Sequence, residues 1–201
     1  MPKVGQEPVR RAALVSATIE EIGRAGSLEV TVGQIAKSAG MSTALAHYYY
    51  DSKSALFLAA MQQILREFGS SVRQQLTDAT SPRARLAAIV AASLGPDQFS
   101  EHIVSAWLVF YVESQRNADA ARLLNIYARR LHSNLVDGLR PLVGVADAHR
   151  IASGAAAMID GIYIRSALHP TRPNGEALVG DYLDQMISTS QGQLDQAGEK
   201  P

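Results

Sequence analysis

Hydrophobic residues recur at helical spacing along nearly the whole chain, and no segment shows the alternation expected of a half-buried strand. Leu14, Thr18 and Ile22 are four residues apart, which predicts a first helix over about 10–23. Glycine, proline and small polar capping residues divide the rest of the chain, with Gly138 and Pro141 predicted to end one helix. The further helices are predicted over about 32–38, 43–49, 52–76, 82–95, 100–114, 119–139, 147–168 and 174–189. The expected fold class is therefore all-α, with about nine helices.

The segment TVGQIAKSAGMSTALAHYYYDSKSALF, residues 31–57, is typical of two short helices joined by a tight turn. Thr31 and Gln34 match a capping box, and Ser42 is a suitable cap for the second short helix. Gly40 supplies a residue that turns at positive φ. This layout is that of a helix-turn-helix, whose second helix enters the major groove of DNA. We therefore expect a three-helix DNA-binding domain over 1–53 and a helical ligand-sensing and dimerisation domain over 54–201.

The polar side of the second short helix is the predicted DNA-contacting surface. Hydroxyls and backbone amides at helix starts bind phosphates, and small, aromatic or imidazole side chains reach base edges. An ordinary solvated helix face remains the alternative for any single residue, but a histidine followed by three tyrosines favours DNA recognition. The candidate DNA-binding residues are Thr31, Ser42, Thr43, Ala44, His47, Tyr48, Tyr49 and Lys53.

Charge adds little to this picture, because the chain has 19 basic and 19 acidic residues. Residues 1–73 carry a net charge of +2 and the remainder −2, which has the sign expected for DNA binding. No apolar run is long enough for a membrane span, the N-terminus lacks an apolar signal core, and cysteine is absent. The histidines lack metal-ligand spacing, and no nucleophile elbow or phosphate loop occurs. We expect a cytoplasmic protein that is not an enzyme and needs no metal or cofactor.

The segment at 31–57 resembles the DNA-binding region of the TetR family of one-component repressors. The chain departs from that family's pattern at His47, where tyrosine or another residue is usual, and at Tyr50, where phenylalanine is usual. The resemblance implies double-stranded operator DNA as a partner, a small-molecule effector, and a homodimer formed by the last two long helices. Small residues at 152 and 154–157 suit close helix approach there, although they can instead pack within one monomer.

The body of the chain carries a narrower resemblance. The opening MPKVG and the segments SPRARLAAIV, AWLVFY, RRLHSNLV and AAMIDGIYIRSAL are similar to the betaine-synthesis (BetI-type) repressors of that family. This resemblance implies repression of genes for choline uptake and glycine betaine synthesis, relieved by choline. The alternative is a repressor of an efflux gene that senses bulky cationic compounds with the same fold.

Choline is a quaternary ammonium ion, which aromatic faces and a nearby carboxylate recognise. Trp107, Phe110 and Tyr111 are spaced i, i+3 and i+4, so they share one helix face. The alternative is that this aromatic stripe is ordinary core, and Asp160 can instead pair with Arg165. The candidate ligand-binding residues are Trp107, Phe110, Tyr111, Tyr127, Asp160 and Tyr163.

Overall fold

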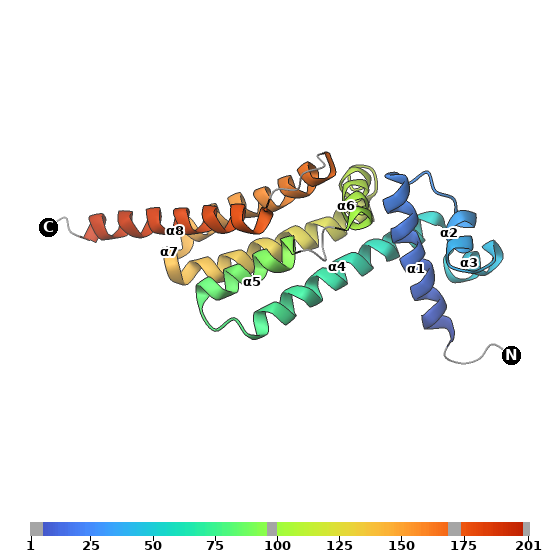
Figure 1. The fold of residues 1–201 in the computed structure, drawn as a ribbon, viewed down its shortest axis with the longest axis horizontal. Coiled ribbons are helices and arrows are strands. Elements are labelled where there is room, and N and C mark those ends of the chain that lie inside the picture. Colours follow the sequence, from blue (N-terminus) through green and yellow to red (C-terminus); the bar gives the residue numbers. More distant parts are fainter. Residues whose placement is uncertain (1–5, 96–99, 169–173, 199–201) are drawn as a thin grey trace. The chain divides into compact units, whose positions relative to one another are not determined.

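The computed structural model describes residues 6–95, 100–168 and 174–198, which form eight helices and no strand (Figure 1). The predicted all-α fold class is confirmed. The helices are α1 Gln6–Ala25, α2 Val32–Ser38, α3 Thr43–Tyr49, α4 Lys53–Thr77, α5 Pro82–Leu94, α6 Glu101–Glu113, α7 Ala118–Leu168 and α8 Gly175–Gly198.

Side-chain oxygens cap the starts of seven described helices, with Ser52, Asn117 and Asn174 at the starts of α4, α7 and α8. Thr31, Ser42, Ser81 and Ser100 each precede a helix and accept a hydrogen bond from a backbone N–H three residues later. Such caps satisfy amides that have no partner within the helix. Pro82 follows Ser81 at the first turn of α5, where its missing N–H costs nothing. These short-range chemical preferences explain why most helix starts were predictable.

The two helices predicted over 119–139 and 147–168 are separated in the structure, but the break lies at Gly144 and not at Gly138 and Pro141. Helix α7 continues through Gly138 and Pro141, and its backbone leaves the helical conformation only at Gly144, where φ is 77°. Burial of Leu139 and Val143 outweighs the proline penalty of about 3 kcal/mol. A Cβ at Gly138 would lie 2.8 Å from Leu86 Cδ2, so this glycine permits close packing against α5 rather than ending the helix.

The last helix is also longer than predicted, because α8 runs to Gly198 instead of ending near residue 189. Ile187 and Ser190 lie on its buried side, and this face continues the apolar repeat begun by Val179 and Leu183.

The described residues form two compact units. The first unit extends up to Glu67 and includes Ser100–Leu124, so it holds α1, α2, α3, α6, most of α4 and the first residues of α7. Within it, α1 packs mainly against α6 and also contacts α2, which in turn packs on α3. The second unit holds the end of α4, α5, most of α7, and α8. The boundary between a DNA-binding and a ligand-sensing domain, expected after residue 53, does not coincide with the boundaries of these two units. It stays a prediction.

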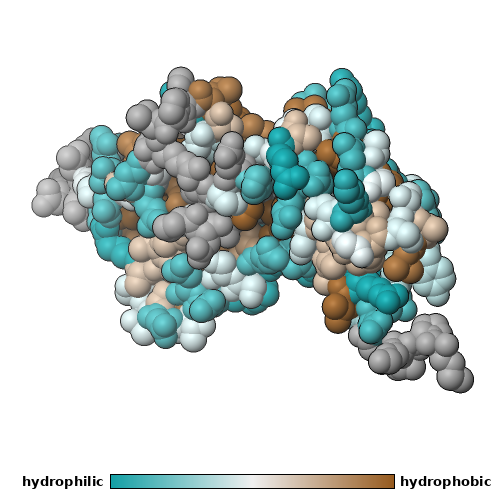
Figure 2. Space-filling view, turned by 45° about the vertical axis from the view of Figure 1, so that its right-hand side comes forward, coloured by the Kyte–Doolittle hydropathy of each residue, from teal (hydrophilic) through white to brown (hydrophobic). Residues whose placement is uncertain are grey.

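Each unit has its own apolar core. Leu14, Ile35, Leu56 and Phe110 are among the fully buried residues of the first unit. In the second unit, α5 and α8 pack together, and the core includes Ile89, Leu131, Leu135 and Ile151. The face drawn in Figure 2 is mostly hydrophilic or intermediate, with hydrophobic residues in scattered groups. None of the described helices is long and apolar enough to cross a membrane.

Candidate DNA-binding face and buried aromatic groups

The turn between α2 and α3 has the geometry that the sequence predicted. Gly40 has φ of 67°, a left-handed conformation that residues with a side chain rarely adopt. The Met41 amide donates to the Ala36 carbonyl at 2.8 Å, which closes the turn. Ile35 and Ala36 are buried beneath it. The two short helices are therefore held at a fixed angle by backbone bonds and a small core.

Two of the candidate phosphate-binding hydroxyls serve as helix caps. Thr31 Oγ1 accepts from the Gln34 amide at 3.2 Å, and the Gln34 side chain accepts from the Thr31 amide at 2.7 Å. Ser42 Oγ accepts from the Leu45 amide at 3.2 Å. Both residues are exposed, and the Thr31 hydroxyl also donates to the Gln34 side-chain oxygen at 2.9 Å, so its donor is engaged within the cap.

The structure brings Thr43, Ala44, His47 and Tyr48 to one exposed face of α3. Tyr48 has 74% of its surface exposed, and its ring makes an edge contact with Tyr49 at 5.2 Å between centroids. Most of this aromatic side chain is therefore available to a partner. The face therefore offers methyl, hydroxyl, imidazole and phenol groups to a partner.

Two other candidates are engaged within the protein. Lys53 is exposed, but its Nζ donates to the Leu28 carbonyl at 2.7 Å. Tyr49 is buried, with 8% of its surface exposed. Direct DNA contacts by these two residues stay predictions.

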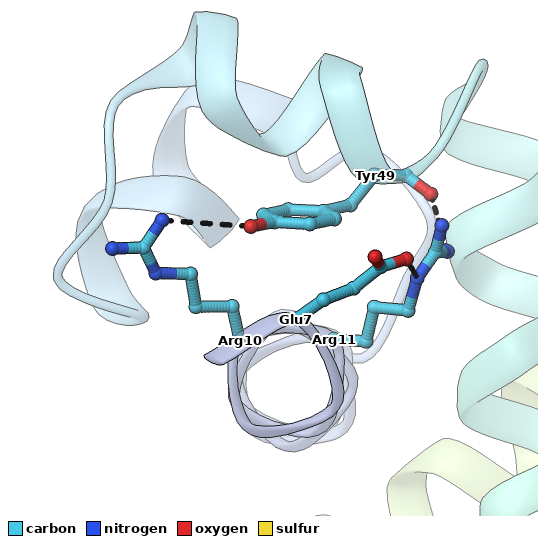
Figure 3. A network of polar contacts seen from close by, with 4 residues as sticks. All are labelled: Glu7, Arg10, Arg11 and Tyr49. Carbon is cyan, nitrogen blue, oxygen red and sulfur yellow. Dashed lines mark hydrogen bonds and ion pairs between the residues drawn. The ribbon is translucent and has the colours of Figure 1, made fainter. Parts of the chain in front are cut away.

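Sequence reasoning missed two arginines on α1 that hold Tyr49 (Figure 3). Arg11 Nη1 donates to the Tyr49 carbonyl at 2.6 Å, and Arg10 Nη1 makes a long 3.5 Å hydrogen bond to the Tyr49 hydroxyl. Glu7 accepts from Arg11 Nε at 2.9 Å. The contacts join residues 38 and 39 positions apart, and no local motif encodes such pairs.

The aromatic residues of α6 are packed together in the first unit. The rings of Trp107 and Phe110 are stacked with centroids 5.4 Å apart, and the ring of Tyr111 lies 6.0 Å from that of Trp107. Trp107 and Phe110 are fully buried, and Tyr111 is half-buried. The predicted shared face is therefore present, and Trp107 and Phe110 on it are part of the core of this unit.

The remaining ligand candidates lie in the second unit. Tyr127 is buried with its ring edge against Phe68, at 5.3 Å between centroids. Tyr163 is also buried, and its hydroxyl donates to the Ser93 carbonyl at 2.5 Å. Burial raises the pKa of the Tyr163 phenol, and the neighbouring charge of Asp160 raises it further. Both effects keep this phenol protonated and able to donate.

The raised pKa of Tyr163 predicts an alkaline loss of stability. Because the folded protein holds this proton more tightly than the unfolded chain, its contribution is complete below pH 10, the ordinary phenol value, and falls as pH rises further. Denaturant titrations above and below pH 10 measure how the free energy of unfolding changes with pH. In Tyr163→Phe this free energy should fall less steeply above pH 10 than in wild type. At neutral pH the variant should lose about 1 kcal/mol with the hydrogen bond to Ser93. An unchanged slope would contradict this assignment.

A groove between α5 and α8 has a volume of about 340 Å³ in the second unit. Its walls do not include the six predicted ligand residues. The lining consists of Arg83, Leu86, Ala87, Val90, Glu176, Gly180, Leu183, Asp184 and Ile187. Across the described ranges, no group of three or more histidine, aspartate or glutamate residues could hold a metal ion.

Two family models match the chain. Residues 14–60 match the N-terminal model "Bacterial regulatory proteins, tetR family", and residues 82–188 match "BetI-type transcriptional repressor, C-terminal". The first match covers the helix-turn-helix, and the second covers α5, α6, all of α7 and more than half of α8.

Curated relatives agree over nearly the full length. The HTH-type transcriptional regulator BetI of Brucella melitensis biotype 2 is 50% identical over 191 residues, covering 94% of this chain and 96% of that protein. The protein of the same name from Agrobacterium fabrum is 50% identical, covering 94% and 93%. These relatives are transcriptional regulators and not enzymes.

Solved structures share the fold. A protein described as a transcriptional regulator from Pseudomonas aeruginosa PAO1 is 26% identical with a TM-score of 0.74, over 92% of this chain and 93% of that one. Another so described, from Saccharomonospora viridis and solved in complex with choline, is 24% identical with a TM-score of 0.75, over 89% and 95%. On its helix-turn-helix, its matched models and its relatives, the chain belongs to the TetR family of transcriptional regulators, with a BetI-type C-terminal part.

Proposed function

We propose that this TetR-family repressor controls genes for choline uptake and glycine betaine synthesis and is released from DNA by choline. The observation that carries the proposal is the 50% identity with the regulator BetI across 94% of the chain. The choline complex of the Saccharomonospora viridis protein supports the choice of ligand. A repressor that senses bulky cationic compounds is the alternative, since buried aromatic residues serve both ligand classes.

The exposed face of α3 is the proposed DNA-contacting surface. Tyr48 and His47 reach base edges or backbone, Thr43 and Ala44 lie against bases, and the N-terminal hydroxyls of α2 and α3 face phosphates. Two copies of the chain place two α3 helices in successive major grooves of a near-palindromic operator.

The homodimer is proposed to form through the C-terminal half of α7 and α8. Ile164, Leu168 and Leu178 are large hydrophobic residues on these helices, and 46%, 69% and 47% of their surfaces are exposed. Such residues are candidates for burial in an interface. Ala152 and Ala155 are already buried within the monomer. Their burial supports the alternative that these two small residues pack within one monomer and not at the dimer interface.

The effector is proposed to use the aromatic faces of α6, with Trp107 as the largest. Tyr127, Asp160 and Tyr163 of the second unit stay predicted ligand residues. The protein has a conformation that binds DNA and one that does not. Choline that binds the second conformation more tightly lowers the affinity for DNA, by an amount set by the ratio of its affinities for the two conformations.

Gel-shift titration of wild-type protein tests this function directly. A duplex selected from a random-sequence library should be bound with a strong dependence on salt concentration. Choline should release the duplex, whereas glycine betaine serves as the comparison compound and tetraphenylphosphonium as the bulky cation. Release by tetraphenylphosphonium alone would establish the efflux-type alternative, and no duplex binding would overturn the DNA-binding proposal.

Trp107→Phe should weaken choline binding about fivefold in calorimetric titration, because phenylalanine presents a weaker face to a cation, a difference of ~1 kcal/mol. Phenylalanine keeps most of the buried volume, so the fold should persist. Tyr111→Phe, at a second candidate ligand residue on the same helix, removes a hydroxyl and keeps the ring, so it separates the contribution of a hydroxyl from that of an aromatic face. Equal choline affinity in Trp107→Phe and wild type would remove Trp107 from the effector site.

A further inference from the structure

The recognition helix α3 is too short to define its own position. It has seven residues, and isolated helices of this length are unstable in water. Its first turn is capped by Ser42. After the last turn the backbone becomes extended at Tyr50, with φ of −138° and ψ of 118°. The last turn therefore lacks the left-handed cap that commonly satisfies terminal carbonyls.

Arg11 supplies the missing contact from another helix. Its Nη1 donates to the Tyr49 carbonyl at 2.6 Å, the last carbonyl of α3. A cation at this end of a helix is also favoured by the helix dipole. The neighbouring Tyr50 amide bonds to the Ala46 carbonyl, so the contact adds to the final helical bond and does not replace it.

The guanidinium of Arg11 is itself held in place. Glu7, one turn earlier on α1, accepts from its Nε at 2.9 Å, and this hydrogen bond raises the pKa of Arg11. The guanidinium centre also lies 5.5 Å from the ring centroid of Tyr49 and 5.4 Å from that of Tyr50. The planar guanidinium is oriented by a carboxylate, a carbonyl and two rings, so its hydrogen bond to Tyr49 has a fixed direction. The flexible ammonium group of a lysine would not fix that direction.

Arg10 holds the same tyrosine from its other end. Figure 3 shows Arg10 reaching the Tyr49 hydroxyl while Arg11 reaches the Tyr49 carbonyl. Tyr49 is buried between α3 and α1, and its sequence neighbour Tyr48 points into solvent. A rotation of the last turn of α3 would therefore displace the exposed tyrosine on the proposed DNA face.

We propose that Arg11 is a positioning residue of the recognition helix. It does not contact DNA, and it fixes the last turn of α3 so that His47 and Tyr48 meet the operator in one orientation. This role rests on the proposed DNA-binding face. Loss of Arg11 should therefore lower discrimination between sequences more than it lowers general attraction to DNA.

The test compares wild type with Arg11→Gln, Arg11→Lys and Arg24→Gln. Arg24 is the matched control, because it lies thirteen residues after Arg11, in the last turn of α1, and pairs with Glu21 three residues away. Each variant is titrated with the duplex selected by wild type and with a scrambled duplex at several salt concentrations. Titration end points at high DNA concentration give the active fraction, so partial unfolding is separated from altered affinity.

Arg11→Gln should lower the ratio of selected to scrambled affinity about tenfold, the order expected when one hydrogen bond from a charged group is lost. The salt slope should stay constant, because no phosphate contact is removed. Arg11→Lys should recover part of the ratio, and Arg24→Gln should match wild type. An unchanged ratio in folded Arg11→Gln would overturn the proposal, and so would a slope reduced by about 0.9, which marks a direct phosphate contact.

Amide hydrogen exchange decides the same question without DNA. In Arg11→Gln the amides of Tyr49 and Tyr50 should exchange about tenfold faster, while those of α2 stay as in wild type. Equal exchange at α3 would refute the positioning role even if the protein bound no DNA. Absence of DNA binding by wild type with faster exchange in the variant would count against the proposed function alone.

Discussion

Replacing Gly23 by alanine is expected to lower the free energy of unfolding by about 2–3 kcal/mol. An added Cβ would lie 2.5 Å from the backbone oxygen of His102 and 2.6 Å from its Cα. These are backbone atoms of α6, so a whole helix must move. Alanine is favoured over glycine within a helix by up to about 1 kcal/mol. The steric clash with α6 is larger than this gain, so the net effect is destabilising.

Gly69→Ala is the matched control for this substitution. Gly69 also lies within a helix, α4, but its added Cβ would be 3.5 Å from the flexible Nη1 of Arg73, an ordinary contact. This variant should be stabilised by about 0.5–1 kcal/mol. Urea titrations of both variants measure the difference, and a Gly23 variant as stable as wild type would show that α1 and α6 do not pack this closely.

Tyr48→Ala is expected to weaken binding to the selected duplex by about 10- to 100-fold, or ~1–3 kcal/mol. The side chain is 74% exposed, so its removal costs the fold little beyond the edge contact with Tyr49. The expected change therefore lies in affinity and not in the unfolding midpoint. Gel-shift titrations and thermal unfolding of the same sample separate the two.

Val112→Ala is a control for loss of an exposed hydrophobic side chain, since Val112 lies on α6 and 57% of its surface is exposed. It should leave both stability and DNA affinity near those of wild type. Duplex affinity in Tyr48→Ala equal to wild type would remove Tyr48 from the DNA-binding face.

Local chemistry made the helix-turn-helix predictable. The capping box at Thr31, the positive φ at Gly40 and the cap at Ser42 each depend on residues within four positions, so a short window of sequence contains all the determinants. The same reasoning placed Tyr48 on an exposed face. Periodicity also gave the all-α fold class, because long helices such as α1 and α4 have a repeating apolar side.

Contacts between distant segments were not predictable in this way. The passage of α7 through Pro141 depends on burial of Leu139 and Val143, which outweighs local propensity. The pairing of Arg11 with Tyr49, and of Lys53 with Leu28, joins separate elements through side chains of many possible orientations. Sequence spacing put Trp107 and Phe110 on one face but could not distinguish a ligand site from core.

The close approach of Gly23 to His102 also bears on how chimeric regulators should be built. A fusion that joins residues 1–53 to an unrelated effector domain would keep α1 but discard the α6 backbone that its glycine packs against. The transplanted helix would then meet whatever side chain the new partner presents. An exchange that carries 100–124 together with the N-terminal segment preserves this interface, so the unit of exchange is discontinuous along the chain.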